Sequence, residues 1–233
     1  MLPGLSAKRL TGLGAGVIAA GAVAAGLWQR IFRRSLPQTS GRLAVDGISG
    51  RVEIRRDRWG VPHVRADSID DLWFGQGFCH GQDRLWQLDL YRRLACGRVA
   101  EIAGAEGLAV DRFTRTLGIR RAALAEEAAL DGALADAMGA YAAGVNAAAS
   151  AAPAPAELQL LRIDFEPWRP ADTLTLTKLL ALGLSTNWER ELLRADMARE
   201  LGPELAARLD PGYPAGNPVV LAPGEPWRGD GAA

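Results

Sequence analysis

Residues 68–98 read SIDDLWFGQGFCHGQDRLWQLDLYRRLACGR, and this stretch sets the helical character of the chain. Ser68 can cap a helix, and the two aspartates that follow it suit the positive first turn. A second helix is predicted from about Gly81 to Ala95, because apolar side chains recur there near helical spacing. These side chains are Leu85, Trp86, Leu90 and Leu94. Gly97 then stands where a helix commonly ends.

The residues before this stretch predict a β-hairpin. Residues 52–55 alternate between apolar and polar side chains, which is typical of a half-buried strand. Val61 and Val64 resume the apolar pattern beyond a break at Trp59-Gly60. A short antiparallel pair is therefore expected at the N-terminal side of the helices.

Beyond Asp111 the pattern is mostly helical. One predicted helix has a buried stripe with spacings of four, three and four, and it ends before Pro153. The stripe is made by Leu134, Met138, Tyr141 and Val145. Asp172 is predicted to cap an apolar helix that runs through Leu182, and a further helix covers about 189–201. The fold class is thus α+β, mostly α-helical with a short N-terminal β-hairpin.

Composition limits the possible partners and scaffolds. The 233 residues include 27 Lys plus Arg and 27 Asp plus Glu, so charge gives no reason to expect nucleic acid as a partner. The only two cysteines are Cys79 and Cys96, which excludes a disulfide-rich scaffold. Their spacing within helical patterns predicts two small buried side chains.

The first 35 residues read as a targeting segment. Leu10 to Trp28 contains no charged residue and is flanked on both sides by Lys and Arg, so residues 10–28 predict an uncleaved membrane anchor. The rival is a cleaved signal peptide, because Ala22-Val23-Ala24 offers a cleavage site. The anchored form would face the periplasm or cell exterior, and the cleaved form would be secreted.

Composition also divides the remaining chain. Residues 36–50 read as a linker, and residues 51–210 as one domain. Residues 211–233 contain five prolines and five glycines, so they predict an irregular tail. We interpret that tail as the start of a spacer peptide.

Few residues could perform chemistry by themselves. The two histidines, His63 on a predicted strand and His80 at a helix junction, are interpreted as a half-buried packing residue and a structural residue. Asp89 lies three and four residues before Arg92 and Arg93, which predicts ion pairs on one helix face. We interpret that group as an ion-paired helix buried against the rest of the protein. No phosphate-binding or dinucleotide glycine pattern is present.

Several short motifs recur together in a fixed order. The first three are Arg56-Asp57-Arg58-Trp59-Gly60-Val61-Pro62-His63-Val64, Phe74-Gly75-Gln76-Gly77-Phe78 and Gln82-Asp83-Arg84-Leu85-Trp86-Gln87-Leu88-Asp89-Leu90. Later ones are Tyr141-Ala142-Ala143-Gly144-Val145-Asn146, Glu166-Pro167-Trp168 and Leu184-Ser185-Thr186-Asn187-Trp188-Glu189. From Val52 to Glu200 the chain resembles the N-terminal α-chain portion of the penicillin acylase family.

The resemblance implies a fold and an activity. It implies the α-chain part of an N-terminal-nucleophile hydrolase precursor, whose αββα core is completed by a β-chain that this sequence does not contain. That family hydrolyses linear amides, and the bond that it breaks is a carbon–nitrogen bond other than a peptide bond. The nucleophile is a serine at the new N-terminus of the β-chain, so the resemblance places no catalytic residue in this sequence.

The resemblance also implies binding residues. Leu184, Asn187 and Trp188 fall in the segment that lines the acyl pocket, although core packing with Asn187 as a helix cap is the alternative. Glu191 matches the glutamate that binds a structural calcium ion in the family. Glu189 is the other candidate, because the motif can be placed one or two residues earlier or later in this sequence. A solvated surface glutamate is the alternative to a calcium ligand.

Two functions remain open at this point. The first is the α-subunit portion of an acylase whose partners are the β-chain of the same precursor and a small-molecule amide. The amide bond would be the one that joins the acyl side chain to a β-lactam, or the one in an N-acyl homoserine lactone. The second is a non-catalytic, membrane-tethered fragment or interaction protein.

Overall fold

The computed structural model describes Val23, residues 25–185 and residues 187–210, and it divides into two compact units. Unit 1 extends to Ala181 and unit 2 begins at Leu182. Unit 1 contains η1 (Gln29–Arg33), β1 (Glu53–Arg56), β2 (Pro62–Arg65), α2 (Ile69–Cys96), α3 (Ala100–Ala103), η2 (Gly104–Gly107), α4 (Leu108–Leu117), α5 (Ile119–Glu127), α6 (Gly132–Ala151) and α7 (Ala156–Leu161). Helix α8 (Pro170–Leu184) begins in unit 1. Unit 2 contains α9 (Trp188–Leu201) and α10 (Pro203–Leu209).

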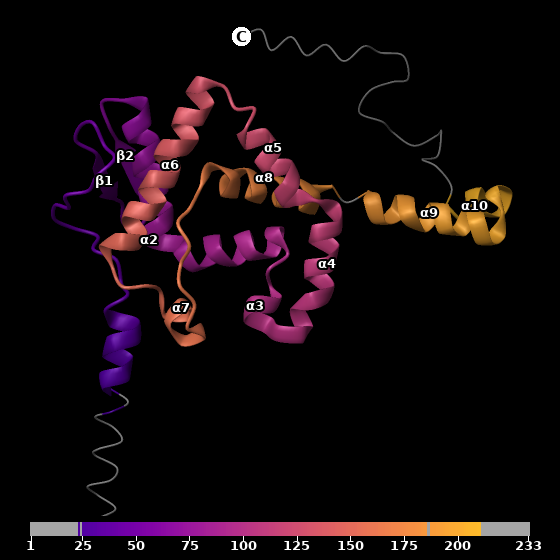
Figure 1. Ribbon diagram of the computed structural model, residues 1–233, viewed down its shortest axis with the longest axis horizontal. Helices are drawn as coiled ribbons and strands as arrows, with labels where there is room; N and C mark the ends of the chain where they lie inside the picture. The colour runs from indigo at the N-terminus through magenta and orange to yellow at the C-terminus, as the bar shows by residue number, and fades with distance from the viewer. Residues whose placement is uncertain (1–22, 24, 186, 211–233) are drawn as a thin grey trace, which may run out of the picture. The chain divides into compact units, whose positions relative to one another are not determined.

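The predicted hairpin is confirmed. Strands β1 and β2 form an antiparallel two-stranded sheet in which Ile54 lies opposite Val64. The mostly helical character with one short N-terminal hairpin therefore agrees with the predicted fold class. Figure 1 shows the hairpin beside the first half of α2.

Helix α2 is the central element of unit 1. The hydroxyl of Ser68 accepts a hydrogen bond from the backbone N–H of Asp71, and Gly97 closes the helix in the left-handed conformation with φ 68°. Both ends therefore lie where the sequence predicts them. The two helices predicted on either side of Gly81 are present as the two halves of α2, which meet at a kink at Arg84, where φ is −139° and ψ is 22° (Figure 1).

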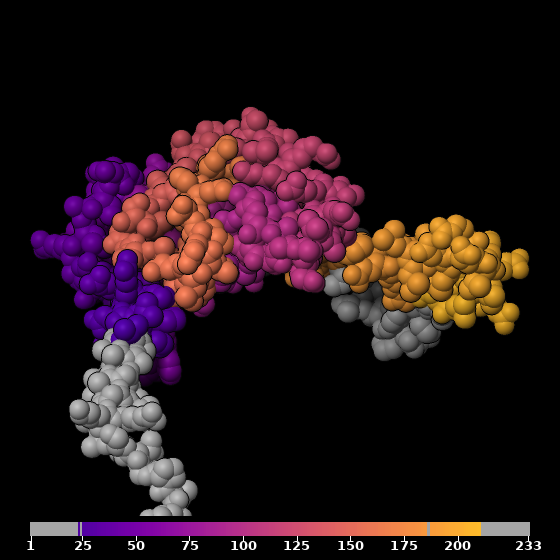
Figure 2. Space-filling model, turned by 60° about the horizontal axis from the view of Figure 1, so that its bottom comes forward, coloured from indigo at the N-terminus to yellow at the C-terminus, as the bar shows by residue number. Residues whose placement is uncertain are grey.

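The hydrophobic core lies between α2 and α6. One cluster contains Leu85, Ala142, Val145 and Trp168, and another contains Phe74, Phe78 and Ala148. Val145 is completely buried, so the predicted stripe of α6 does face the core at this point. In Figure 2 the orange segment after α7 lies against the magenta surface of α2, where Arg92 donates a hydrogen bond to the carbonyl oxygen of Glu166 at 2.9 Å.

Helix boundaries later in the chain differ from the predictions in two places. Helix α8 begins at Pro170, so Asp172 lies within its first turn and not before it. From there the carboxylate of Asp172 accepts a hydrogen bond from the backbone N–H of Arg169 at 2.9 Å. Helix α10 was not predicted, although proline at its first position, Pro203, is a usual start signal. The predicted helix over about 189–201 is confirmed as α9.

The predicted membrane anchor is wrong as far as the structure describes the chain. No helix of the described ranges is long and apolar enough to cross a membrane. The described end of the predicted span is followed directly by the π-helix η1, which carries Arg30 and Arg33. The predicted membrane anchoring through residues 10–28, with the protein facing the periplasm or cell exterior, is therefore not supported. Residues 10–22 and Ala24 of that run lie outside the described residues.

The other segment boundaries stay predictions. These are the linker at 36–50 and the domain at 51–210, and the tail predicted at 211–233 lies outside the described residues. Residues 46–50 are nevertheless tied to α2. The carboxylate of Asp71 accepts hydrogen bonds from the backbone N–H groups of Ser49 at 2.8 Å and Gly50 at 3.0 Å. Those hydrogen bonds, that from Ser49 above all, lower the pKa of Asp71.

Candidate functional site

The predicted substrate-binding residues lie around the connection between α8 and α9. Leu184 is the last residue of α8, and its side chain is 82% exposed. Asn187 occupies the N-cap position of α9, and Trp188 is the first residue of that helix. Trp188 is 37% exposed. Two large apolar side chains are thus presented at the surface of unit 2, while Thr186 lies outside the described residues.

Asn187 is paired with the predicted calcium ligand. Its side chain makes no capping hydrogen bond to the backbone, and its amide Nδ2 donates instead to Oε1 of Glu191 at 2.9 Å. The same carboxylate oxygen lies 3.4 Å from Nη1 of Arg194. The fold therefore brings Asn187 and Glu191 together through their spacing of four residues on one helical turn.

A calcium ion would need more oxygen donors than the described residues of unit 2 supply around Glu191. Calcium takes six to eight oxygen ligands. Over the described ranges, no three His, Cys, Asp or Glu side chains are grouped so as to hold a metal ion. Glu189 is exposed in the same first turn of α9. The carboxylate of Glu191 has the right chemistry for one ligand, and a complete site requires donors from elsewhere.

Sequence reasoning missed a second charged group in unit 2. Arg190 donates to Oδ1 of Asp210 at 2.5 Å, and Arg194 pairs with the other carboxylate oxygen. The two arginines lower the pKa of Asp210, and Asp210 in turn raises the pKa of Arg194. These pairs join α9 to the residue that follows α10. The four-residue spacing of the arginines was visible in the sequence, whereas their partner was not.

Unit 1 contains a buried ion cluster formed by Asp89, Arg92, Arg93, Arg120 and Asp172. Asp89 is completely buried and accepts hydrogen bonds from Arg92 at 2.5 Å and Arg93 at 2.7 Å. Asp172 accepts from Arg120 at 2.7 Å and lies 3.3 Å from Nη1 of Arg92. The predicted ion-paired helix is therefore confirmed, and its partners on α5 and α8 are added by the fold.

The buried ion cluster is structural in character. The guanidinium of Arg92 also lies over the rings of Phe165 and Trp168, at 5.0 Å and 5.2 Å from their centroids. Within the described part of the chain, every buried side-chain nitrogen and oxygen has a hydrogen-bond partner. The cluster thus holds α2, α5, α8 and the loop before α8 together, and its polar atoms are engaged with one another.

Neither histidine forms a catalytic group with the residues around it. His63 was predicted to be half-buried, but its side chain is 66% exposed, with Nε2 at 3.4 Å from Oδ2 of Asp57. Nδ1 of His80 lies 2.8 Å from the hydroxyl of Tyr141, which links α2 to α6. Partial burial lowers the pKa of His80, and burial raises the pKa of Tyr141 to about 12.

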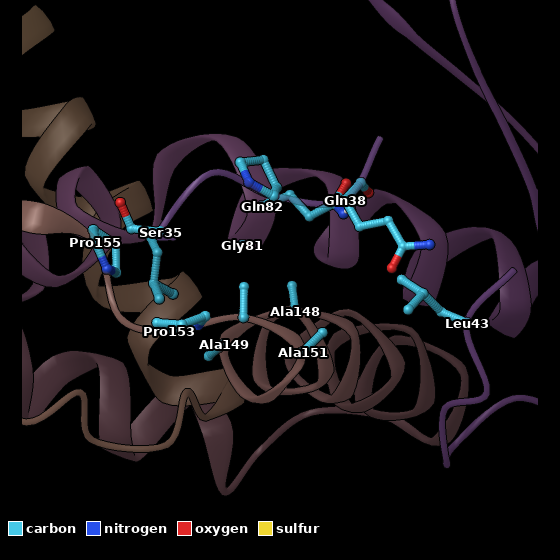
Figure 3. Close-up of a pocket in the computed structure, with 13 residues that line it drawn as sticks. Ser35, Gln38, Leu43, Gly81, Gln82, Ala148, Ala149, Ala151, Pro153 and Pro155 are labelled. Carbon is cyan, nitrogen blue, oxygen red and sulfur yellow. Dashed lines mark hydrogen bonds between the residues drawn. The ribbon is translucent and has the colours of Figure 1, made fainter. Parts of the chain in front are cut away.

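A small cavity lies between α2 and α6, and Figure 3 shows its lining. Gly81 and Gln82 of α2 face Ala148 and Ala149 of α6 across it, and Pro153 closes one end. Its volume is about 30 Å³, which is the share of one water molecule in the liquid. The small side chains therefore leave room for solvent and not for an amide substrate.

The chain matches a known family over most of its length. The family model described as penicillin amidase matches residues 51–229. Penicillin acylase 2 proenzyme from Pseudomonas sp. (strain SE83) is 40% identical over 158 residues, which cover 67% of this chain and 20% of the relative. Acyl-homoserine lactone acylase QuiP from Pseudomonas aeruginosa is 35% identical over 188 residues, which cover 80% of this chain and 22% of the relative.

A solved structure agrees with these relatives. Thermostable penicillin G acylase from Alcaligenes faecalis, in its tetragonal form, matches with a TM-score of 0.60 and 28% identity. The match covers 73% of this chain and 96% of that chain. The chain thus spans about a fifth of the length of the curated relatives that it matches, and nearly all of one chain in a solved acylase structure. On the family match over residues 51–229 and these relatives, the chain belongs to the penicillin amidase family.

Proposed function

We propose that this chain is the α-subunit portion of an acylase precursor that hydrolyses a linear amide. One observation carries the proposal. The chain covers a fifth of a relative named as a proenzyme, and it covers 96% of a single chain in a solved penicillin G acylase. A piece of a precursor that corresponds to one whole chain of an enzyme is expected of a subunit released by cleavage.

The proposed substrate has an acyl group joined to an amine by an amide bond. The relatives are named for penicillin and for acyl-homoserine lactones, and each of these compounds carries an amide-linked acyl side chain. Hydrolysis of either one breaks a carbon–nitrogen bond other than a peptide bond. The proposal covers both types of acyl donor, and the alternative of a non-catalytic interaction protein is favoured by no observation on the described residues.

The reacting groups of the proposed enzyme belong to the β-chain. An N-terminal serine attacks the amide carbonyl while its own α-amino group accepts the hydroxyl proton. A neutral α-amine suits this role because its pKa lies near 8. Hydrogen-bond donors then stabilise the tetrahedral oxyanion. This chain's contribution would be to complete the αββα fold and to bind the acyl group.

We propose that Leu184 and Trp188 provide an apolar wall for the acyl group, with Asn187 beside them. Support comes from their exposure, since 82% of Leu184 and 37% of Trp188 remain open in unit 2. An apolar and aromatic wall with one polar group suits an acyl chain or a phenyl ring. The pairing of Asn187 with Glu191 would fix the amide orientation within this wall.

We further propose that Glu191 supplies one carboxylate ligand to a structural calcium ion, with the remaining oxygen donors on the β-chain. The positive charge of calcium would compensate the negative charge of Glu191 at a subunit boundary. The competing carboxylate is Glu189, two residues earlier on the same helix.

The test is to express the complete precursor that contains this chain. Mass spectrometry should find a second chain that begins with serine, and the product should release the acyl group from penicillin G or from an N-acyl homoserine lactone. Replacement of that serine by alanine should abolish both cleavage and hydrolysis. A precursor that stays intact and releases no acyl group from either substrate would refute the proposal.

A further inference from the structure

The two strands of the hairpin leave one edge open in a defined way. The backbone N–H of Asp57 donates to the carbonyl oxygen of Val61 at 3.1 Å, which sets the alternation of the ladder. Hydrogen-bonded pairs in an antiparallel ladder recur at every second residue. Arg55 and His63 therefore form the next such pair, and the backbone groups of Ile54 point away from β2.

The outer edge of β1 has no backbone partner in the described ranges. The N–H and C=O groups of Ile54 and Arg56 point to that side, and no hydrogen bond to them from another described segment is found. The outer edge of β2 differs, because Pro62 has no N–H to donate. An isolated two-stranded ribbon is marginally stable, and an open edge is a template for another strand. The loss of one donor at Pro62 thus makes the β2 edge a poorer template for a further strand than the β1 edge.

A groove runs along this open edge. Its volume is about 560 Å³, and it lies between β1, the first half of α2 and residues 38–45. Val45, Ile48, Ile54, Phe74 and Phe78 give it an apolar lining. The segment opposite β1 therefore stands away from the strand and does not pair with it, which leaves space beside the unpaired backbone groups.

The rim of the groove is basic. Arg56 is held by the carboxylate of Asp83 at 2.8 Å, so its charge is compensated. Arg42 and Arg51 also line the groove, and neither has a carboxylate of the described ranges within salt-bridge distance. The one acidic lining residue is Glu53, whose pKa is lowered by its hydrogen bond from Arg55 above all and, to a lesser extent, by the charge of Arg51. A peptide that carries a carboxylate near this rim would complement the two arginines.

We infer that the outer edge of β1 receives an extended peptide as a third strand, supplied by the part of the precursor that this chain does not contain. This inference rests on the proposed function. About four fifths of each curated relative lies outside its match to this chain, so the precursor has ample chain to provide the strand. The incoming strand has alternating apolar side chains that enter the groove beside Phe74 and Phe78, and an acidic side chain near Arg42 or Arg51.

Hydrogen exchange tests the edge directly. In the mature two-chain enzyme, prepared from the full precursor, the backbone amides of Ile54 and Arg56 should exchange at least tenfold more slowly than that of Val64. The amide of Val64 points to the outer edge of β2 and serves as the internal reference. An enzyme that cleaves itself and hydrolyses amides, yet exchanges the amides of Ile54 and Arg56 as fast as that of Val64, overturns the inference and leaves the proposed function standing.

A matched pair of substitutions tests the same edge through assembly. Ile54→Pro and Val64→Pro alter partners in one non-hydrogen-bonded pair, so each leaves the β1–β2 ladder bonds in place and removes one inward-facing apolar side chain. Only Ile54→Pro removes a donor from the open edge. We expect the yield of the two-chain enzyme to fall at least tenfold for Ile54→Pro relative to Val64→Pro. Equal yields contradict the inference.

Other occupants of the groove give different outcomes. A second copy of this chain on the β1 edge would join two copies of the two-chain enzyme into a dimer that Ile54→Pro abolishes, and this result would overturn the inference. A bound small molecule would leave the amides of Ile54 and Arg56 exchanging rapidly in the two-chain enzyme. Where both proline variants fail to accumulate, the exchange comparison on the unmodified enzyme decides.

Discussion

Gly77 of α2 lies directly against the backbone of Tyr141 in α6, and a β-carbon at Gly77 would lie 2.1 Å from the carbonyl oxygen of Tyr141. Gly144 of α6 lies equally close to the backbone of α2, because a β-carbon at Gly144 would lie 2.0 Å from the carbonyl oxygen of Phe74. The two helices therefore pack with backbone against backbone at this crossing. Any side chain at either position would push them apart.

The first prediction concerns this crossing. Gly77→Ala should lower the free energy of unfolding by about 1–3 kcal/mol, because the gain in helix propensity is smaller than the cost of overpacking. Gly139→Ala on α6 is the control, since a β-carbon there meets nothing within 4 Å. The control should be neutral or stabilising by up to about 1 kcal/mol. Urea denaturation of both variants measures the difference, and equal stabilities would contradict the proposed close contact.

The second prediction concerns the buried ion cluster. Asp89→Asn keeps the shape of the side chain but leaves Arg92 and Arg93 without their shared carboxylate. We expect a loss of about 3–5 kcal/mol in the free energy of unfolding, because uncompensated buried charge is costly. The control is Asp196→Asn, which breaks the exposed pair with Arg199 and should cost less than about 1 kcal/mol. A similar small loss in both variants would mean that the buried ion cluster is not needed.

The third prediction concerns the stability of the fold at low pH. The guanidinium of Arg98 holds the pKa of Glu166 down at about 2. Because the folded pKa is below the unfolded value near 4.5, the pair stabilises the fold above that value and loses this effect as the pH falls through about 2. The carboxylate is half exposed, so the stabilisation is small, below about 1 kcal/mol. An NMR titration of Glu166 measures the pKa directly, and Arg98→Gln should return it towards its ordinary value.

The fourth prediction concerns the acyl pocket. In the mature two-chain enzyme, Trp188→Ala should raise KM or lower kcat/KM for an aromatic acyl group by roughly 10–100-fold, because a large apolar contact is lost. Leu193→Ala is the control, since Leu193 lies on the same helix and is also exposed but is not among the predicted pocket residues. Kinetics with acyl groups of different size make the comparison. Equal losses in the two variants would place the acyl pocket elsewhere.

The fifth prediction concerns calcium. Addition of a chelator should lower the Tm of the two-chain enzyme, since removal of a ligand bound to the folded state removes its stabilisation. Glu191→Gln should weaken calcium affinity by about tenfold or more, because one anionic ligand is lost. Glu189→Gln is the matched variant on the same helical turn. If the second variant shows the loss and the first does not, Glu189 is the ligand.

Local signals were enough to predict several elements. Ser68 caps α2 and Gly97 ends it as expected, because both devices act through hydrogen bonds between residues a few positions apart. The pairing of Asp89 with Arg92 and Arg93 was predictable for the same reason. The missed helix α10 had a local signal in Pro203 that was not used.

The candidate site was predictable only as a segment. The motif order located Leu184, Asn187 and Trp188 and the two glutamates near them, whereas the pairing of Asn187 with Glu191 came from the structure. The predicted membrane anchor failed on the described residues, because an uncharged run alone does not reveal how much of it forms an apolar helix.

The hairpin, the ends of α2, the ion pairs along one helix face and the family were all predictable from the sequence, because each depends on neighbouring residues or on the order of motifs. Three contacts became visible only in the folded chain: Asp172 pairs with Arg92, 80 positions away, Gly77 packs on the backbone of Tyr141, and the outer edge of β1 borders a groove. Such contacts between distant residues depend on how packed elements approach one another. A pattern along the chain records which face of an element is apolar, and it does not record what that face will meet.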